Sequence, residues 1–261
     1  MERYQITADD RLRIAPQADM LKVSGDQIFA TLQGEGVTAG SNAIFLRLHF
    51  CNLACGKESG WQCDTGYTLD KDRPEFWQEP QNWSYLDTAN NVKKLWADEF
   101  DQTTPDDEKR IVITGGEPLL QQEKIIELLE YMSNWKVEIE TNGTIKPSDK
   151  LNGCQINCSP KLKNSGNSKV RRYKPEVLKA INKMPNSWFK FVVVTSYDLD
   201  EVSQIVIDCG LSPEKIMVMP EGHTKEATDE HQASFEQEAL KRGWKIAKRN
   251  QLEWFGSKRR T

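Results

Sequence analysis

The sequence lacks the long apolar runs, the leader and the excess of one charge that mark several large classes of protein. No apolar run approaches about 18 residues, and the N-terminus has no charged-then-apolar leader, so neither membrane insertion nor export is expected. Lys and Arg number 35 against 39 Asp and Glu, a balance that gives no electrostatic footprint for nucleic acid. The basic end of the chain, Lys258-Arg259-Arg260-Thr261, reads as a short solvated charge run.

Cysteine is also scarce, because the 261 residues hold only six. This number is far from a disulfide scaffold, and with the clustering of the cysteines and the absent leader it favours a reducing compartment, so we expect a cytoplasmic protein. Three of the six share one short stretch, and the others are expected to be small packed apolar side chains: Cys154, Cys158 and Cys209. No internal repeat or low-complexity linker is present, which predicts a single domain over 1–261.

Short apolar runs recur at the spacing of alternating strands and helices, which favours an α/β fold with a parallel sheet covered by helices. Six such units fall short of a closed eight-unit barrel, so we expect a partial (β/α)6 TIM-like barrel with N- and C-terminal additions. The expected strands are Ala43–Leu48, Arg110–Thr114, Lys136–Glu140, Gln155–Cys158, Phe189–Thr195 and Lys215–Met219. The expected helices are Asp87–Phe100, Gln121–Ser133, Pro175–Lys183, Leu199–Cys209 and Ser234–Arg242.

Three segments are expected as additions to these units. Gln27–Gln33 reads as a further strand before a glycine-containing turn, and Lys245–Phe255 is expected to cover an open edge, so that the core spans about 27–256. Gly66–Lys109 is long enough to be a cap or insertion. Its tryptophans are expected mainly to form a local core, with a partner surface as the lesser option: Trp77, Trp83 and Trp96.

Polar or glycine-containing turns follow five of the six expected strands. In barrel enzymes the C-terminal ends of the strands gather the active site, so these turns are expected to build one shared site. In chain order they are the loop that holds Cys51, Cys55 and Cys63 (the cysteine loop), Thr114–Pro118, Thr141–Thr144, Ser159–Lys161 and Pro220–Gly222.

The cysteine loop predicts a soft-metal site. Cys51, Cys55 and Cys63 supply three thiolates, whereas a cluster of four irons and four sulfurs normally takes four cysteines, one per iron. Three would leave one iron open to bind a further ligand. The alternatives are a structural zinc, for which only His49 lies near, and three packed thiols in a polar loop.

Two further features are expected to face a ligand. Gly115 and Gly116 would let the backbone approach it closely, and Glu117 could accept hydrogen bonds from an ammonium group. Arg47 is expected to share one face of its strand with Phe45 and His49, opposite Ile44, Leu46 and Leu48. A guanidinium in a core strand needs a partner, which is either a ligand carboxylate or one of two glutamates, Glu138 and Glu140.

Taken together, these motifs resemble the 7-carboxy-7-deazaguanine synthase family of the radical S-adenosylmethionine superfamily. The resemblance runs from about Gln27 to Gly256, and several of the matching sequence motifs are specific to the family rather than to the superfamily. They are Thr31-Leu32-Gln33-Gly34-Glu35-Gly36, Phe45-Leu46-Arg47-Leu48, Cys51-Asn52-Leu53, Cys63-Asp64-Thr65, Thr114-Gly115-Gly116-Glu117-Pro118, Glu140-Thr141-Asn142-Gly143-Thr144, Ser159-Pro160-Lys161 and Val218-Met219-Pro220-Glu221-Gly222.

The resemblance implies a partial barrel of the radical S-adenosylmethionine type and a carbon–nitrogen lyase. Such enzymes convert 6-carboxy-5,6,7,8-tetrahydropterin to 7-carboxy-7-deazaguanine with loss of ammonia, in the biosynthesis of queuosine precursors. It also implies a [4Fe-4S] cluster, S-adenosylmethionine, Mg²⁺, a flavodoxin-like electron donor and a homodimer. A 5′-deoxyadenosyl radical does the chemistry, so no catalytic side chain is assigned.

By position, the resemblance distributes these ligands over the motifs. Cys51, Cys55 and Cys63 would hold the cluster, and Thr65 the Mg²⁺. The pterin would lie against Leu32, Gln33, Gly34, Arg47 and Thr114. S-adenosylmethionine would lie against Gly116, Ser159, Pro160 and Lys161, with Met219, Pro220, Glu221 and Gly222 as a weaker group.

The sequence departs from the family pattern in two places. Seven residues, 56–62, separate Cys55 from Cys63 where two are usual, although a longer closure costs only about 1 kcal/mol. Near the C-terminus, Gln251 is the nearest equivalent of a histidine that faces the pterin in many members. His223 and His231 are assigned no role. The rival functions are another radical S-adenosylmethionine enzyme, such as a glycyl-radical activase, and a zinc-binding nucleic-acid module.

Overall fold

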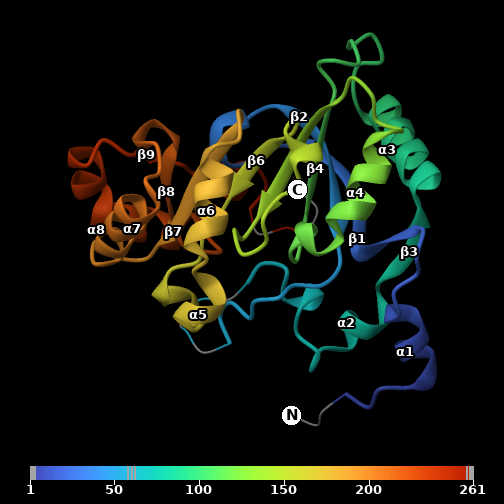
Figure 1. The fold of residues 1–261 in the computed structure, drawn as a ribbon, viewed down its shortest axis with the longest axis horizontal. Helices are drawn as coiled ribbons and strands as arrows, with labels where there is room; N and C mark the ends of the chain where they lie inside the picture. The colour runs from blue at the N-terminus through green and yellow to red at the C-terminus, as the bar shows by residue number, and fades with distance from the viewer. Residues whose placement is uncertain (1–3, 58, 60, 62, 257, 259–261) are drawn as a thin grey trace.

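One curved sheet runs through the molecule. The computed structural model describes residues 4–57, 59, 61, 63–256 and 258, and within them nine strands pair in the order β3-β1-β2-β4-β5-β6-β7-β8-β9 (Figure 1). The strands are β1 (Met20–Leu32), β2 (Asn42–Leu48), β3 (Gln81–Ser84), β4 (Arg110–Gly115), β5 (Lys136–Thr141), β6 (Gln155–Cys158), β7 (Ser187–Val193), β8 (Ile216–Pro220) and β9 (Lys245–Ile246).

The six predicted strands are all present, and they form a continuous parallel array from β2 to β8. The sequence of β-then-α units and the order of the strands confirm the predicted partial barrel. Beyond β8, Lys245 and Ile246 pair in parallel with Met217 and Val218, as expected for a segment that covers the sheet edge.

The N-terminal edge is longer than predicted. β1 begins at Met20 rather than Gln27, and its antiparallel register with β2 shifts between Val23 and Ile28, where Gln27 has a φ of 45°. The first four residues of β1 pair with β3, so part of the predicted insertion 66–109 extends the main sheet.

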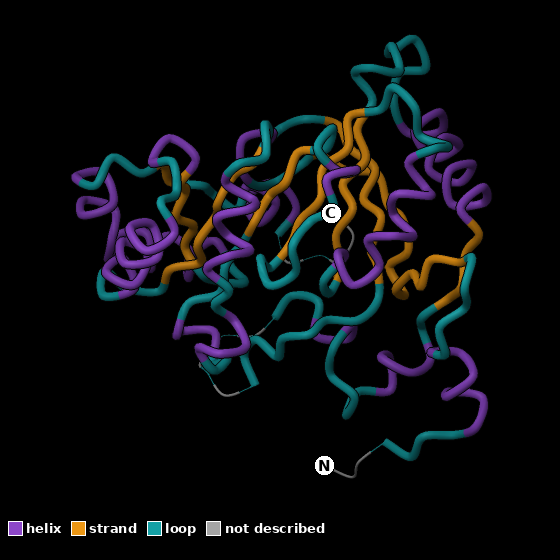
Figure 2. The backbone as a smooth tube through the Cα atoms, in the orientation of Figure 1, coloured by secondary structure: helices purple, strands orange, loops and turns teal. Residues whose placement is uncertain are grey.

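Helices follow the strands and pack along the sheet (Figure 2). The α-helices are α1 (Ala8–Ile14), α2 (Pro74–Gln78), α3 (Tyr85–Glu99), α4 (Gln122–Leu129), α5 (Lys169–Arg172), α6 (Pro175–Asn182), α7 (Asp198–Cys209), α8 (Lys225–Lys241) and α9 (Asn250–Phe255). The 3₁₀ segments are Gly36–Thr38, Gly66–Thr68, Pro118–Gln121, Asp149–Leu151, Lys163–Ser165 and Pro213–Lys215. α8 begins nine residues before the predicted Ser234, because the hydroxyl of Thr224 caps it by accepting from the Ala227 N–H.

Alternation along β2 separates the core from the interior of the barrel. Ile44, Leu46 and Leu48 are fully buried in the main core, while Phe45 and Arg47 face a cavity, as predicted. His49 was predicted on the cavity face, but β2 ends at Leu48 and the His49 side chain does not line the cavity. Of the three tryptophans in this segment, Trp96 on α3 belongs to the main core, and Trp83 packs against that core partly buried. Trp77 is buried beside Phe76. Cys154, Cys158 and Cys209 are buried as predicted.

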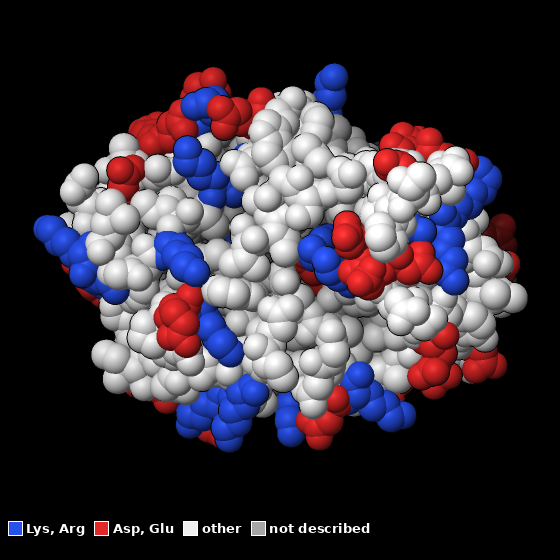
Figure 3. Space-filling view, turned by 90° about the horizontal axis from the view of Figure 1, so that it is seen from above, with Lys and Arg blue, Asp and Glu red and all other residues white. Residues whose placement is uncertain are grey.

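The surface shows no segregation of charge on the face drawn in Figure 3, which carries the loop between α3 and β4. Lys, Arg, Asp and Glu side chains alternate over that face. None of the helices in the described part of the chain is both long enough and apolar enough to cross a membrane.

Candidate active site

The C-terminal ends of the parallel strands surround a cavity of about 610 Å³, a volume typical of small-molecule sites. Its walls come from the turn after β1, the cysteine loop, the ends of the strands from β4 to β8, and the C-terminal segment. The predicted site residues that line it are Gln33, Arg47, Cys51, Cys55, Cys63, Thr65, Thr114, Gly116, Ser159, Lys161, Met219, Pro220 and Glu221. Four others lie beside these: Leu32, Gly34, Pro160 and Gly222.

Two of the three thiols, those of Cys51 and Cys55, are positioned by side-chain amides from neighbouring turns. Asn167 Nδ2 donates to Cys55 Sγ at 3.3 Å, and Asn142 Nδ2 lies 3.9 Å from Cys51 Sγ. Asn167 also accepts the Ala54 N–H through Oδ1 at 2.9 Å. The segment after β6 thereby fixes the first part of the cysteine loop.

The donor set suits an iron–sulfur cluster. Burial raises the pKa of the Cys51 thiol to about 12, and the nearby Cys63 and Cys55 add to the shift, so bound metal would have to replace the protons. In the described part of the chain, no three His, Cys, Asp or Glu side chains converge closely enough to hold a single ion. A cubane takes one cysteine per iron and does not need that convergence.

His49, which was considered as a zinc ligand, does not line the cavity that holds the three cysteines. The His49 ring is buried beyond the end of β2 and packs against Phe50 and Phe76, with ring centroids 4.7 and 4.8 Å away. Burial lowers the pKa of His49 to about 4, so the ring is neutral. His49 therefore contributes to packing beneath the cysteine loop.

Thr65 fits the predicted magnesium site. Its hydroxyl donates to the Gly115 carbonyl at 3.2 Å, which leaves the lone pairs of Oγ1 available to a hard cation. Oγ1 also lies 3.5 Å from Cys63 Sγ, so the two predicted metal sites adjoin.

The predicted pterin residues form a second wall. Thr114 Oγ1 donates to Glu140 at 2.7 Å, and Gln33 Nε2 contacts the same carboxylate at 3.4 Å. Arg47 lies over the Phe29 ring at 5.4 Å, and that ring stacks on Phe45 with centroids 5.2 Å apart. Glu138, one of the partners considered for Arg47, forms an ion pair with Arg110.

Gly115 and Gly116 line the cavity, and together with Glu117 they also hold the turn at the end of β4 in place. A Cβ on Gly115 or Gly116 would lie 2.0 Å from the Leu48 carbonyl oxygen or 2.1 Å from that of Phe50, so these glycines let the chain approach itself. Glu117 is fully buried and accepts from Leu119 N, Thr141 Oγ1 and Asn142 N. It joins two turns and does not line the cavity.

The predicted S-adenosylmethionine wall is polar. Lys161 Nζ donates to Ser159 Oγ at 2.9 Å, and the Glu221 carbonyl oxygen lies 2.7 Å from His231 Nδ1. His223, which the sequence left without a role, lines the cavity with Nδ1 3.0 Å from Asp64.

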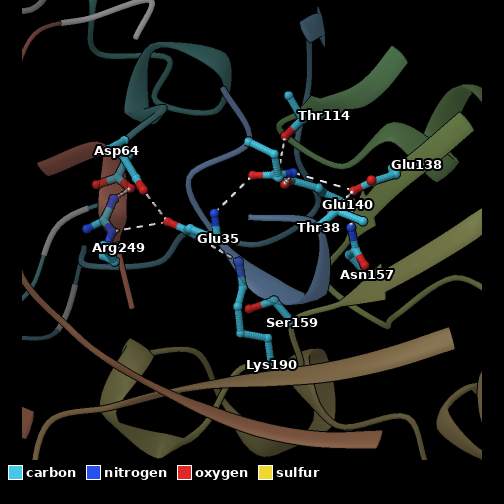
Figure 4. Close-up of polar contacts among 12 residues, drawn as sticks. Glu35, Thr38, Asp64, Thr114, Glu138, Glu140, Asn157, Ser159, Lys190 and Arg249 are labelled. Atoms are coloured by element: carbon cyan, nitrogen blue, oxygen red, sulfur yellow. Dashed lines mark hydrogen bonds and ion pairs between the residues drawn. The ribbon is translucent and has the colours of Figure 1, made fainter. Parts of the chain in front are cut away.

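Charged residues that sequence reasoning missed complete the site (Figure 4). Lys190 offered a signal, because a lysine between Phe189 and Phe191 in a core strand must face the barrel interior. Arg249 offered none, since it reaches the site from an irregular segment. The charged residues that line the cavity but were given no role include Glu35, Asp64, Lys190 and Arg249, and the polar Asn157 joins them. Glu140, considered as a partner of Arg47, also lines it.

Comparison with curated proteins identifies the family of this chain. No family model matches the chain. The curated 7-carboxy-7-deazaguanine synthase of Pyrobaculum aerophilum is 31% identical over 227 residues, which cover 85% of this chain and 86% of that protein. The chain belongs to the 7-carboxy-7-deazaguanine synthase family. The predicted resemblance is thereby confirmed.

Two further comparisons are consistent with membership of the 7-carboxy-7-deazaguanine synthase family. The protein of that name from Rhodopirellula baltica is 28% identical, covering 90% of this chain and 87% of its own length. The crystal structure of QueE from Escherichia coli superposes with a TM-score of 0.63 at 23% identity, covering 88% of this chain and 93% of that chain. This structural similarity supports the fold described above.

Proposed function

We propose that this chain is a radical S-adenosylmethionine enzyme that converts 6-carboxy-5,6,7,8-tetrahydropterin to 7-carboxy-7-deazaguanine with loss of ammonia. The observation that carries the proposal is that one cavity gathers three cysteines, Thr65 and the pterin motif residues Gln33, Arg47 and Thr114. Family membership favours this activity over that of a glycyl-radical activase.

Cys51, Cys55 and Cys63 would hold a [4Fe-4S] cluster. Such a cluster would supply the electron for reductive cleavage of S-adenosylmethionine. Asn167 and Asn142 orient amide N–H groups toward two of the sulfurs and thereby favour electron uptake.

Other side chains would position the two organic ligands. Arg47 offers a planar guanidinium to the pterin carboxylate, and Thr114 and Gln33 offer polar contacts beside Glu140. Thr65 would hold Mg²⁺, with water and substrate oxygens filling the remaining positions. Gly116, Ser159 and Lys161 face the same space and would hold S-adenosylmethionine, with Met219–Gly222 on the far side.

The electron would come from a flavodoxin-like protein in the cytoplasm, and the enzyme would work as a homodimer. A basic ridge on α5 supports the first of these assignments: Lys169 and Arg171 are exposed on either side of Val170, which is 80% exposed. Arg171 Nη2 donates to the Asn52 carbonyl at 2.7 Å, so this ridge touches the cysteine loop (Figure 1). An acidic donor docked here would lie close to the cluster.

The deciding experiment is anaerobic reconstitution with iron and sulfide, followed by turnover of the carboxytetrahydropterin with and without Mg²⁺. The product is followed by ultraviolet absorption. We expect Cys63→Ala to abolish turnover. Full activity of that variant would refute the proposed ligand set, and zinc at one per chain with no sulfide would refute the radical chemistry.

A further inference from the structure

Arg249 makes contacts in three directions. It directly precedes α9, and its side chain is only 11% exposed. Nε donates to Glu35 at 3.2 Å, Nη2 to the Asp64 carboxylate, and Nη1 to the Gly222 carbonyl. Figure 4 shows the guanidinium between Asp64 and Glu35.

Each partner belongs to a different wall of the cavity. Glu35 follows the Leu32-Gln33-Gly34 turn, Asp64 stands between Cys63 and Thr65, and Gly222 ends the Met219–Gly222 segment. One guanidinium therefore joins the pterin wall, the metal loop and the S-adenosylmethionine wall. Its planar fork of donors is suited to such a junction, which an ammonium group cannot reproduce.

The three contacts are not equally replaceable. Glu35 keeps an ion pair with Lys190 and a hydrogen bond from Gln251 Nε2 at 2.6 Å if Arg249 is lost. Asp64 would keep His223 at 3.0 Å, but that ring is itself half-exposed, so Asp64 would lose more of its support than Glu35. The Gly222 carbonyl would lose the charged donor that fixes it. Loss of Arg249 should therefore disturb the metal loop and the Gly222 segment more than the Glu35 turn.

We propose that Arg249 is a positioning residue that holds the Cys63-Asp64-Thr65 loop and Gly222 in register, and so sets the affinity for Mg²⁺ and S-adenosylmethionine. This proposal rests on the proposed function. Arg249 acts through Asp64 and Gly222 and does not touch the reacting atoms. Partners that orient metal ligands typically account for about 10- to 100-fold in affinity.

The test compares Arg249→Met with Arg242→Met in reconstituted enzyme. Arg242 is a matched control, because it joins α7 and α8 through Asp200, Glu238 and the Leu199 carbonyl, away from the cavity. The readout is the change that S-adenosylmethionine causes in the electron paramagnetic resonance spectrum of the reduced cluster, titrated without pterin. The Mg²⁺ concentration for half-maximal turnover is measured separately.

We expect Arg249→Met to bind iron normally, to need about tenfold more S-adenosylmethionine and Mg²⁺, and to keep the pterin KM within about threefold. Arg242→Met should titrate like wild type. Equal titrations for wild type and Arg249→Met, or equal weakening by Arg242→Met, would overturn the proposal.

If Arg249→Met does not take up the cluster, Arg249→Lys decides, since it keeps the charge but not the fork. A weaker S-adenosylmethionine titration than wild type supports the proposal, and an unchanged one refutes it. The proposed function fails separately, if the wild-type cluster does not respond to S-adenosylmethionine or if the wild-type enzyme does not turn over the pterin.

Discussion

Gly116 and Phe50 approach so closely that a Cβ on the glycine would lie 2.1 Å from the Phe50 carbonyl oxygen. The same carbonyl accepts the Glu117 N–H at 2.8 Å, and Phe50 itself has a φ of 79°. The turn after β4 is thereby locked against the first residue of the cysteine loop, so the geometry of the metal site depends on the absence of a single methyl group.

Gly116→Ala should therefore reduce cluster incorporation, because backbone atoms rather than a flexible side chain occupy the space. We expect a loss of stability of about 2 kcal/mol or more and iron uptake well below that of wild type. Gly153→Ala is the control, since nothing lies within 4 Å of the added Cβ. Iron and sulfide analysis after anaerobic reconstitution measures the effect, and equal loading of both variants would contradict the explanation.

The sequence predicted the parallel strands well because each is a compact apolar run followed by a turn. It missed the first half of β1, where Lys22, Ser24 and Gly25 interrupt the pattern, and β3, whose residues Gln81–Ser84 include a single apolar side chain. Both depend on tertiary pairing, since Met20–Val23 and β3 form strands by hydrogen bonding to each other.

The candidate site could likewise be predicted only in part. Motifs at strand ends could be found because turn residues and cysteines are local signals. Arg249 could not, because it meets Glu35 across 214 residues of sequence. Gly115 and Gly116 could be found from their motif, but their close approach to the backbone of Leu48 and Phe50 is a tertiary contact that no local signal reveals.

Lys22 should make stability depend on pH in the alkaline range. Its side chain is 3% exposed, and burial, with a smaller effect of Lys124, lowers its pKa from 10.5 to about 8. Below pH 8 the folded protein bears the full cost of a buried charge. Between about pH 8 and 10.5 the unfolded chain binds more protons than the folded one, so the free energy of unfolding should rise with pH.

Lys22→Met should remove this contribution. We expect the stability of wild type relative to the variant to rise by up to about 3 kcal/mol between pH 7 and 10.5. The variant also loses the hydrogen bond from Lys22 Nζ to the Arg13 carbonyl, so the change with pH is the readout. Lys94→Met, at an exposed position on α3, corrects for the change in net charge. Denaturant unfolding between pH 7 and 10.5 measures the difference, and a gap that stays constant with pH would show that Lys22 is not the titrating group.

The basic ridge on α5 should matter for electron delivery from a protein donor. Reversal of both charges, Lys169→Glu with Arg171→Glu, should repel an acidic donor while leaving the cavity unchanged, since neither residue lines it. We expect turnover with reduced flavodoxin to fall about tenfold or more at low salt, and the deficit to shrink as salt screens the charges.

Two controls separate docking from damage to the cluster, which is a risk because Arg171 contacts the Asn52 carbonyl. Turnover driven by dithionite, a small reductant that needs no docking surface, should stay within about twofold of wild type, as should the absorption spectrum of the cluster. Lys94→Glu, on α3, should leave flavodoxin-driven turnover unchanged. A parallel fall with both reductants would mean that the charge reversal acts on the cysteine loop, and the ridge would then have no part in recognising the donor.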